Sequence, residues 1–134
     1  MIRSTTLGTA LSLAIAAPAV ALPPLDQNRT VVDGFYAIGL ADEVRKNCDD
    51  IAPRMFRAFG YLRQLHAYAK DAGYSDDQID ALTKDKAAKA QLKARIRSDL
   101  AARGASADRP QGYCAVGREE IAADSAAGRL LKAR

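Results

Sequence analysis

The sequence predicts an all-α fold, a small bundle of four to five short helices closed by one disulfide. Three observations predict it. Alanine is abundant while aromatic residues make up only 6% of the 134 residues, apolar positions recur at helical spacing, and no segment alternates convincingly as a strand does. The length fits one domain, for which we expect residues 22–134, with residues 22–29 as a flexible leader.

The first residues have the pattern of a secretory signal peptide. Arg3 gives a positive start, residues 7–17 form an uncharged and mostly apolar run, and Pro18 precedes the small residues of Ala19-Val20-Ala21. A membrane anchor is the alternative, but the apolar run is shorter than the roughly 20 residues that span a bilayer. We therefore expect residues 1–21 to be removed as a signal peptide and the remaining chain to be soluble in the periplasm.

Cys48 and Cys114 are the only cysteines of the chain. In an oxidising compartment an even cysteine count indicates a disulfide, and two cysteines allow one intramolecular pairing. The alternative is a redox pair or a haem attachment, but the chain has no Cys-x-x-Cys motif. We therefore predict a structural bridge. The chain has a single histidine besides these two cysteines, which is too few ligands for a zinc cluster or a Cys-ligated iron–sulfur centre. We therefore expect no cofactor.

The first two predicted helices precede Gly73. The first covers residues 30–47, because Tyr36, Leu40 and Val44 recur every four residues and Thr30 offers a cap. The second covers residues 51–72 and ends at Gly73, a residue typical of the position after a helix. Its apolar stripe is wide, so we predict that it forms the centre of the core. Within it, we expect Phe59 and Leu62 to be among the most buried residues.

The clearest local signal is Ser75 followed by Gln78, the pattern of a capping box. It predicts a short helix that ends near Thr83. A further helix is expected over residues 85–103. Whether the two are continuous is left open, because Asp85 offers a cap for the second one. After the breakers Pro110 and Gly112, we expect a last helical region over residues 113–132.

One helical face collects basic side chains at spacings of three, four and four. These residues are Lys86, Lys89, Lys93 and Arg97. Apolar residues occupy the opposite side and are expected to face the core; they are Leu92, Ile96 and Leu100. The basic face is a candidate contact surface for an acidic protein or anionic lipid head groups, with a plain solvated face as the alternative. Nucleic acid is not expected, because no aromatic platform interleaves the basic residues.

Other titratable residues give no site. His66 lacks a second histidine or a free cysteine as partner, so we interpret it as a surface or boundary residue. The aspartates of residues 76–80 lack the spacing of a calcium loop and suit the start of a helix instead. No nucleophile–His–acid grouping or phosphate-binding loop is visible. We therefore predict a non-enzymatic protein, with an enzyme of unrecognised site as a remaining alternative.

Several sequence features together point to a family. They are the signal peptide, the Asn47-Cys48 turn, the Gly73-Tyr74-Ser75 junction and residues 112–121, which read Gly-Tyr-Cys-Ala-Val-Gly-Arg-Glu-Glu-Ile. In these features the chain resembles small exported alphaproteobacterial proteins, mostly from relatives of Rhodobacter, that are classed as a domain of unknown function. The resemblance implies an accessory or assembly role at the periplasmic face of a respiratory membrane complex, complex I.

A looser resemblance is to periplasmic acid-stress chaperones, which are also small, helical and exported, with one disulfide closing a long loop. The likeness is architectural, and the net charge of +4 departs from that group. Our leading hypothesis is a non-enzymatic periplasmic interaction protein, with an unknown protein or an anionic membrane surface as partner. The chaperone function is the alternative hypothesis; it predicts that the second helix exposes its apolar face under acid stress.

Overall fold

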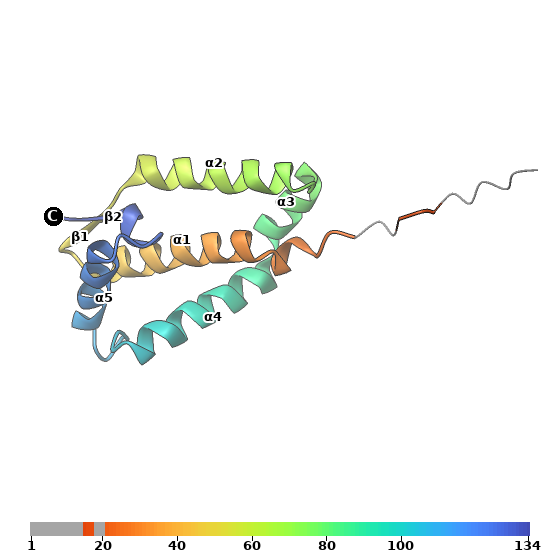
Figure 1. Cartoon of the computed structure of the whole chain (residues 1–134). Helices are drawn as coiled ribbons and strands as arrows, with labels where there is room; N and C mark the ends of the chain where they lie inside the picture. The colour runs from red at the N-terminus through yellow and green to blue at the C-terminus, as the bar shows by residue number, and fades with distance from the viewer. Residues whose placement is uncertain (1–14, 18–20) are drawn as a thin grey trace, which may run out of the picture.

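The computed structural model describes residues 15–17 and 21–134, and Figure 1 shows the arrangement of its elements. The helices are α1 (Arg29–Asn47), α2 (Met55–Asp71), α3 (Asp76–Lys84), α4 (Lys86–Ala102) and α5 (Gln111–Ala122). Short strands β1 (Ile51–Pro53) and β2 (Leu131–Ala133) pair with each other, and two 3-10 turns are η1 (Leu25–Gln27) and η2 (Gly128–Leu130). The all-α prediction is confirmed. Most of the predicted signal peptide lies outside the described residues.

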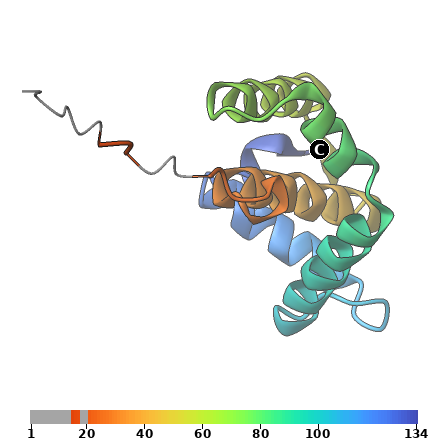
Figure 2. The same cartoon turned by 90° about the vertical axis from the view of Figure 1, so that its right-hand side faces the viewer.

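Helix α1 forms the centre of the molecule. Two views at right angles show α2 and α4 on opposite sides of it, with α5 near its C-terminal end (Figures 1 and 2). Its buried residues include Leu40 and Val44, and Val44 is completely enclosed. These side chains join a core cluster with Ile96 and Leu100 of α4 and Val116 of α5. The prediction that the second helix forms the centre of the core is therefore wrong.

The predicted disulfide is confirmed. Cys48 follows the last residue of α1, and Cys114 lies in the first turns of α5, with their Cα atoms 5.2 Å apart. That separation falls within the usual range for bridged cysteines. The bridge fastens α5 to the corner at which the chain leaves α1.

The two strands are a departure from the prediction, which assigned both segments to helices. They pair antiparallel, with Ile51 opposite Ala133 and Pro53 opposite Leu131. Ile51 and Leu131 are both buried, so the pair closes one end of the core. The backbone amide of Arg54 extends the contact by donating to the Leu130 carbonyl at 2.7 Å. Strand residues that pair across so great a distance in the chain leave no local pattern in the sequence that would predict the pairing.

The last helix is shorter than predicted. It ends at Ala122, and Asp124 then adopts a left-handed conformation with φ 49° that turns the chain back. Gly128 packs so closely on α5 that a Cβ there would overlap the carbonyl of Glu120. The return of residues 124–133 across α5 is thus a product of tertiary packing, which overrides helical propensity.

Side-chain caps define three helix starts. Asn28, rather than the expected Thr30, caps α1 by accepting a hydrogen bond from the Val31 amide. The capping box is confirmed, since Ser75 Oγ accepts from the Gln78 amide and Gln78 Oε1 accepts from the Ser75 amide. Asp85 caps α4, and therefore α3 and α4 are separate helices.

The segment predicted as a leader packs partly on the domain. Leu25 is buried in a second apolar cluster with Val31 and Ile79. The Tyr74 hydroxyl donates a hydrogen bond to the Pro23 carbonyl at 2.8 Å. These contacts hold η1 against the junction between α2 and α3.

Candidate functional site

The most unusual surface of the molecule lies on α2. In the part of the chain that the structure describes, seven large hydrophobic side chains are exposed, and five of them belong to α2. Phe56 is 94% exposed and Phe59 is 57% exposed. The prediction that Phe59 and Leu62 are among the most buried residues of this helix is therefore wrong. We call Met55, Phe56, Phe59 and Leu62 the α2 apolar face.

The exposure follows from how α2 packs. Leu65 and Ala69 are buried against the rest of the domain, and Ala58 and Tyr61 are half-buried. Leu65 sits directly over Gly34 of α1, where any side chain at that glycine would overlap it. Only one side of the helix is covered in this way, because no further element of residues 21–134 lies over its outer side (Figure 1). The apolar stripe is wider than the contact with α1.

The α2 apolar face is continuous along the helix. Met55, Phe59 and Leu62 are spaced by four and three residues, so they follow one another on one side, and Phe56 lies next to Phe59. Tyr68 lies on another side of the helix, with its hydroxyl near Asn28 and Thr30. The face therefore occupies the N-terminal half of α2.

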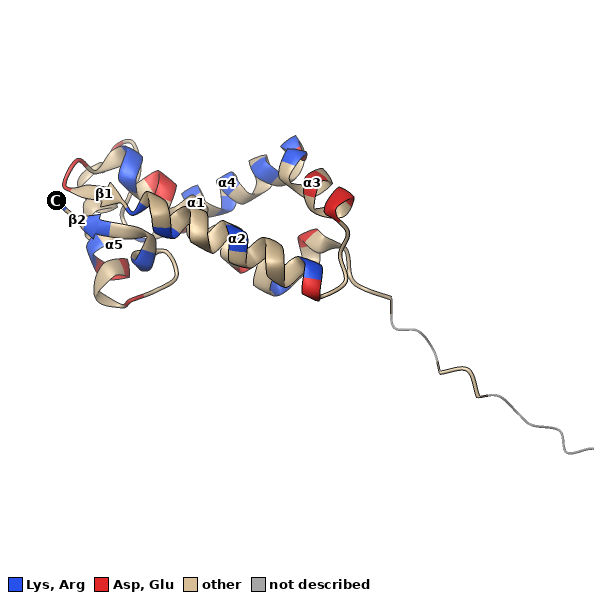
Figure 3. Ribbon diagram, turned by 90° about the horizontal axis from the view of Figure 1, so that it is seen from above, with Lys and Arg blue, Asp and Glu red and all other residues tan. Residues whose placement is uncertain are grey.

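The segment that carries this face has basic side chains and no acidic one. Residues 51–70 carry four basic side chains and no acidic side chain; they are Arg54, Arg57, Arg63 and Lys70. Arg54 is engaged inward, since its Nε donates to the Leu131 carbonyl at 3.0 Å. The others are exposed, although Arg57 Nη1 donates to the Arg129 carbonyl at 3.4 Å and Lys70 is paired with Asp76. Figure 3 shows the red of an acidic residue at the C-terminal end of α2. The face therefore combines apolar surface with positive charge.

His66 lies at the C-terminal end of α2, where that helix meets α3. Its Nε2 is 3.5 Å from a carboxylate oxygen of Asp76, and the Lys70 ammonium is 3.2 Å from the other oxygen. The His66 side chain is about half exposed. These contacts connect α2 to the start of α3 and give His66 the surface position that we predicted.

The four basic residues singled out on α4 are all exposed. They have different surroundings, because Arg97 Nε lies 3.8 Å from Glu43 of α1, whereas Lys89 borders a cavity beside α3. Ile96 and Leu100 are buried on the opposite side of the helix, as predicted. Figure 3 shows the blue of basic residues along α4 and the red of acidic residues on α3 beside it. A contact role for Lys86, Lys89, Lys93 and Arg97 stays a prediction.

A hydrogen bond joins α1 to α4 at the middle of the molecule. The Tyr36 hydroxyl donates to Asp99 Oδ2 at 2.8 Å, and the Arg95 guanidinium lies over the Tyr36 ring, 4.8 Å from its centroid. Burial, together with this hydrogen bond, raises the pKa of Tyr36 to about 12. The phenol therefore stays protonated and keeps donating at physiological pH.

Ion pairs join α4 to α5. Arg103 of α4 forms ion pairs with Glu119 at 3.0 Å and Glu120 at 2.6 Å, which join α4 to α5. Among the described residues, the one group of three close potential metal ligands is Cys48, Asp50 and Cys114, and its two sulfurs are bonded to each other. No helix of this part of the chain has the length and apolar character needed to span a bilayer.

Comparison with known proteins identifies a family. A family model described as a family of unknown function, DUF5333, matches residues 23–132, nearly the whole described domain. No curated protein and no solved structure matches the chain. The matched range includes both cysteines, the α2 apolar face and the basic residues of α4. The chain therefore belongs to DUF5333, a family of unknown function.

Proposed function

We propose that this protein is a non-enzymatic accessory protein of the periplasm that binds the anionic surface of a membrane through the α2 apolar face. The observation that carries the proposal is the exposure of Phe56 and Phe59 within residues 51–70, which carry four basic side chains and no acidic one. Export is supported by the signal-peptide pattern of residues 1–21. An accessory role at a respiratory complex is supported by the family resemblance alone.

Amphipathic helices bind membrane interfaces by burying apolar side chains and by electrostatic attraction to anionic head groups, and we expect the same two contributions here. A phenylalanine side chain gains about 1.5–3 kcal/mol when it moves fully out of water, and the α2 apolar face carries two of them. Basic residues beside an apolar face add attraction to anionic head groups, about 1 kcal/mol for each cation near the surface. Arg63 is exposed one turn after Phe59 and is positioned for that contribution, whereas Arg57 Nη1 donates to the Arg129 carbonyl at 3.4 Å.

A flotation experiment tests the proposal. We expect the processed chain, residues 22–134, to float with vesicles that contain phosphatidylglycerol and much less with pure phosphatidylcholine. Phe56→Ser combined with Phe59→Ser is expected to reduce flotation at least about tenfold, since both side chains lose their apolar contact. Raising the salt concentration is expected to weaken binding as well, because it screens the head-group attraction.

The matched control is Tyr68→Ser, which removes an exposed aromatic ring from another side of the same helix. It is expected to float as the unchanged protein does. Equal flotation of the double variant and the unchanged protein would contradict the proposal. So would an absence of flotation with anionic vesicles, and capture of a membrane protein that depends on Phe56 and Phe59 would then make a protein partner the occupant of the face.

A further inference from the structure

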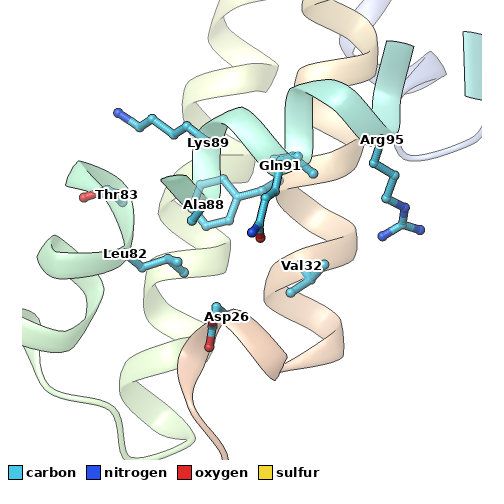
Figure 4. A pocket seen from close by; sticks show the side chains of 10 residues that line it. Asp26, Val32, Leu82, Thr83, Ala88, Lys89, Gln91 and Arg95 are labelled. Carbon is cyan, nitrogen blue, oxygen red and sulfur yellow. The ribbon is translucent and has the colours of Figure 1, made fainter. Parts of the chain in front are cut away.

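A cavity of about 330 Å³ opens between η1, α1, α3 and α4, away from the α2 apolar face (Figure 4). This size is at the lower end of the range of small-molecule sites, roughly 300–1,000 Å³. Apolar side chains from three helices supply most of its wall; they are Val32, Phe35, Leu82, Ala88 and Leu92. The site thus has the apolar lining that ligand pockets usually have.

The cavity exists because α4 packs on α1 over only part of its length. Ile96 fits against Gly39 so closely that a side chain at that glycine would overlap it. One turn earlier Leu92 is half-buried, and another turn earlier Ala88 lines the cavity instead of contacting the core. Leu82 of α3 also lines the opening. The space therefore lies beside α3, where α4 no longer packs on α1.

The edge of the cavity is basic. Lys89 and Arg95 stand at opposite edges, and Gln91 points between them (Figure 4). Asp26 is the only acidic residue of the lining. A ligand that suits these surroundings combines an apolar body with an anionic end.

We propose that this cavity binds a linear amphiphile with a carboxylate head, a free fatty acid in chemical class. The hydrocarbon chain lies against Phe35 and Leu92, and the carboxylate is bound by Arg95. Arginine presents a planar fork that fits a carboxylate with two parallel hydrogen bonds, and stacking on Tyr36 already orients this guanidinium. Lys89, on its flexible stem, lies at the other edge and contributes to attraction. This proposal is independent of the α2 apolar face.

Calorimetric titration with dodecanoate below its micelle concentration tests the proposal. Ala88→Trp fills the cavity and is expected to weaken binding at least about tenfold. Ala90→Trp places the same side chain two residues away on the exposed surface of α4 and is expected to bind as the unchanged protein does. The melting temperatures of both variants, measured in parallel, show whether each remains folded.

A second pair of variants tests the head-group contact. Arg95→Gln is expected to weaken dodecanoate binding about tenfold, whereas Arg97→Gln, which lies outside the cavity lining and faces Glu43, is expected to leave it unchanged. Dodecanol, which lacks the charge, is expected to bind the unchanged protein about as weakly as dodecanoate binds Arg95→Gln. Equal affinity of the Ala88→Trp and Ala90→Trp proteins, or no saturable binding by the unchanged protein, would overturn the proposal.

Discussion

Replacing both cysteines, Cys48→Ala with Cys114→Ala, is expected to lower the free energy of unfolding by about 4 kcal/mol. The bridge joins residues that are 66 positions apart, so its loss frees a long loop of the unfolded chain. A domain of this size has roughly 5–15 kcal/mol of stability in all, and the loss would be a large part of it. Alanine is the appropriate replacement because the Cys48 side chain is buried and a hydroxyl there would lack a partner.

Urea unfolding of the oxidised protein and the double variant measures this difference. The midpoint is expected to fall strongly, and the slope is expected to change because the unbridged chain is less compact when unfolded. A difference below about 1 kcal/mol would show that the loop between the cysteines is constrained by something other than the bridge.

Leu100→Ala is expected to destabilise the fold by about 2–5 kcal/mol, while Phe59→Ala changes stability by less than about 0.5 kcal/mol. Leu100 is completely buried in the main core cluster, where truncation leaves a cavity between α1, α4 and α5. Phe59 is 57% exposed on α2, so its ring contributes little to folding. The larger residue therefore has the smaller effect, which is the reverse of what side-chain size alone suggests.

The two variants are compared by urea unfolding under the same conditions, with Leu65→Ala as a control on α2. Because Leu65 is buried over Gly34, its truncation is expected to destabilise the protein although it lies on the same helix as Phe59. A Phe59→Ala loss as large as that of Leu100→Ala would place the α2 apolar face inside the folded core.

Local features of the fold were predictable from the sequence, and distant pairings were not. The capping box at Ser75 and the Asp85 cap depend on side chains that lie within a few residues of the groups they bind. The disulfide follows from a count of two cysteines. In contrast, the pairing of β1 with β2 joins segments at opposite ends of the domain, each only three residues long. Strands this short have no periodicity to detect.

The sequence wrongly predicts that the apolar stripe of α2 is buried in the centre of the core, and this difference has a physical reason. Phe59 and Leu65 both belong to the apolar stripe of this helix, and the sequence indicates only that the stripe is wide. Which part is covered depends on Gly34 of α1, whose missing side chain lets Leu65 approach. Phe59 then lies outside the contact. The candidate site could be found from the sequence as an apolar stripe, but its exposure needed the three-dimensional packing of α1 and α2.

The exposed face is costly for a protein that remains alone in solution. Phe56 and Phe59 are mostly exposed, and together with Met55 and Leu62 they present a continuous apolar surface to water. Large exposed apolar patches with polar rims mark interaction sites in soluble proteins. The basic residues of α2 favour a binding partner that is anionic as well as apolar. We therefore favour an anionic membrane surface.

The fluorescence of a single tryptophan tests this membrane contact most directly. The chain contains no tryptophan, so Phe59→Trp provides the only indole, and Ala122→Trp provides a matched reporter at an exposed position of α5, away from both α2 and the basic residues of α4. With phosphatidylglycerol vesicles, we expect the emission of Phe59→Trp to shift to shorter wavelength as the ring leaves water, and that of Ala122→Trp to stay unchanged. A shift confined to Ala122→Trp, or no shift in either protein, would contradict the account.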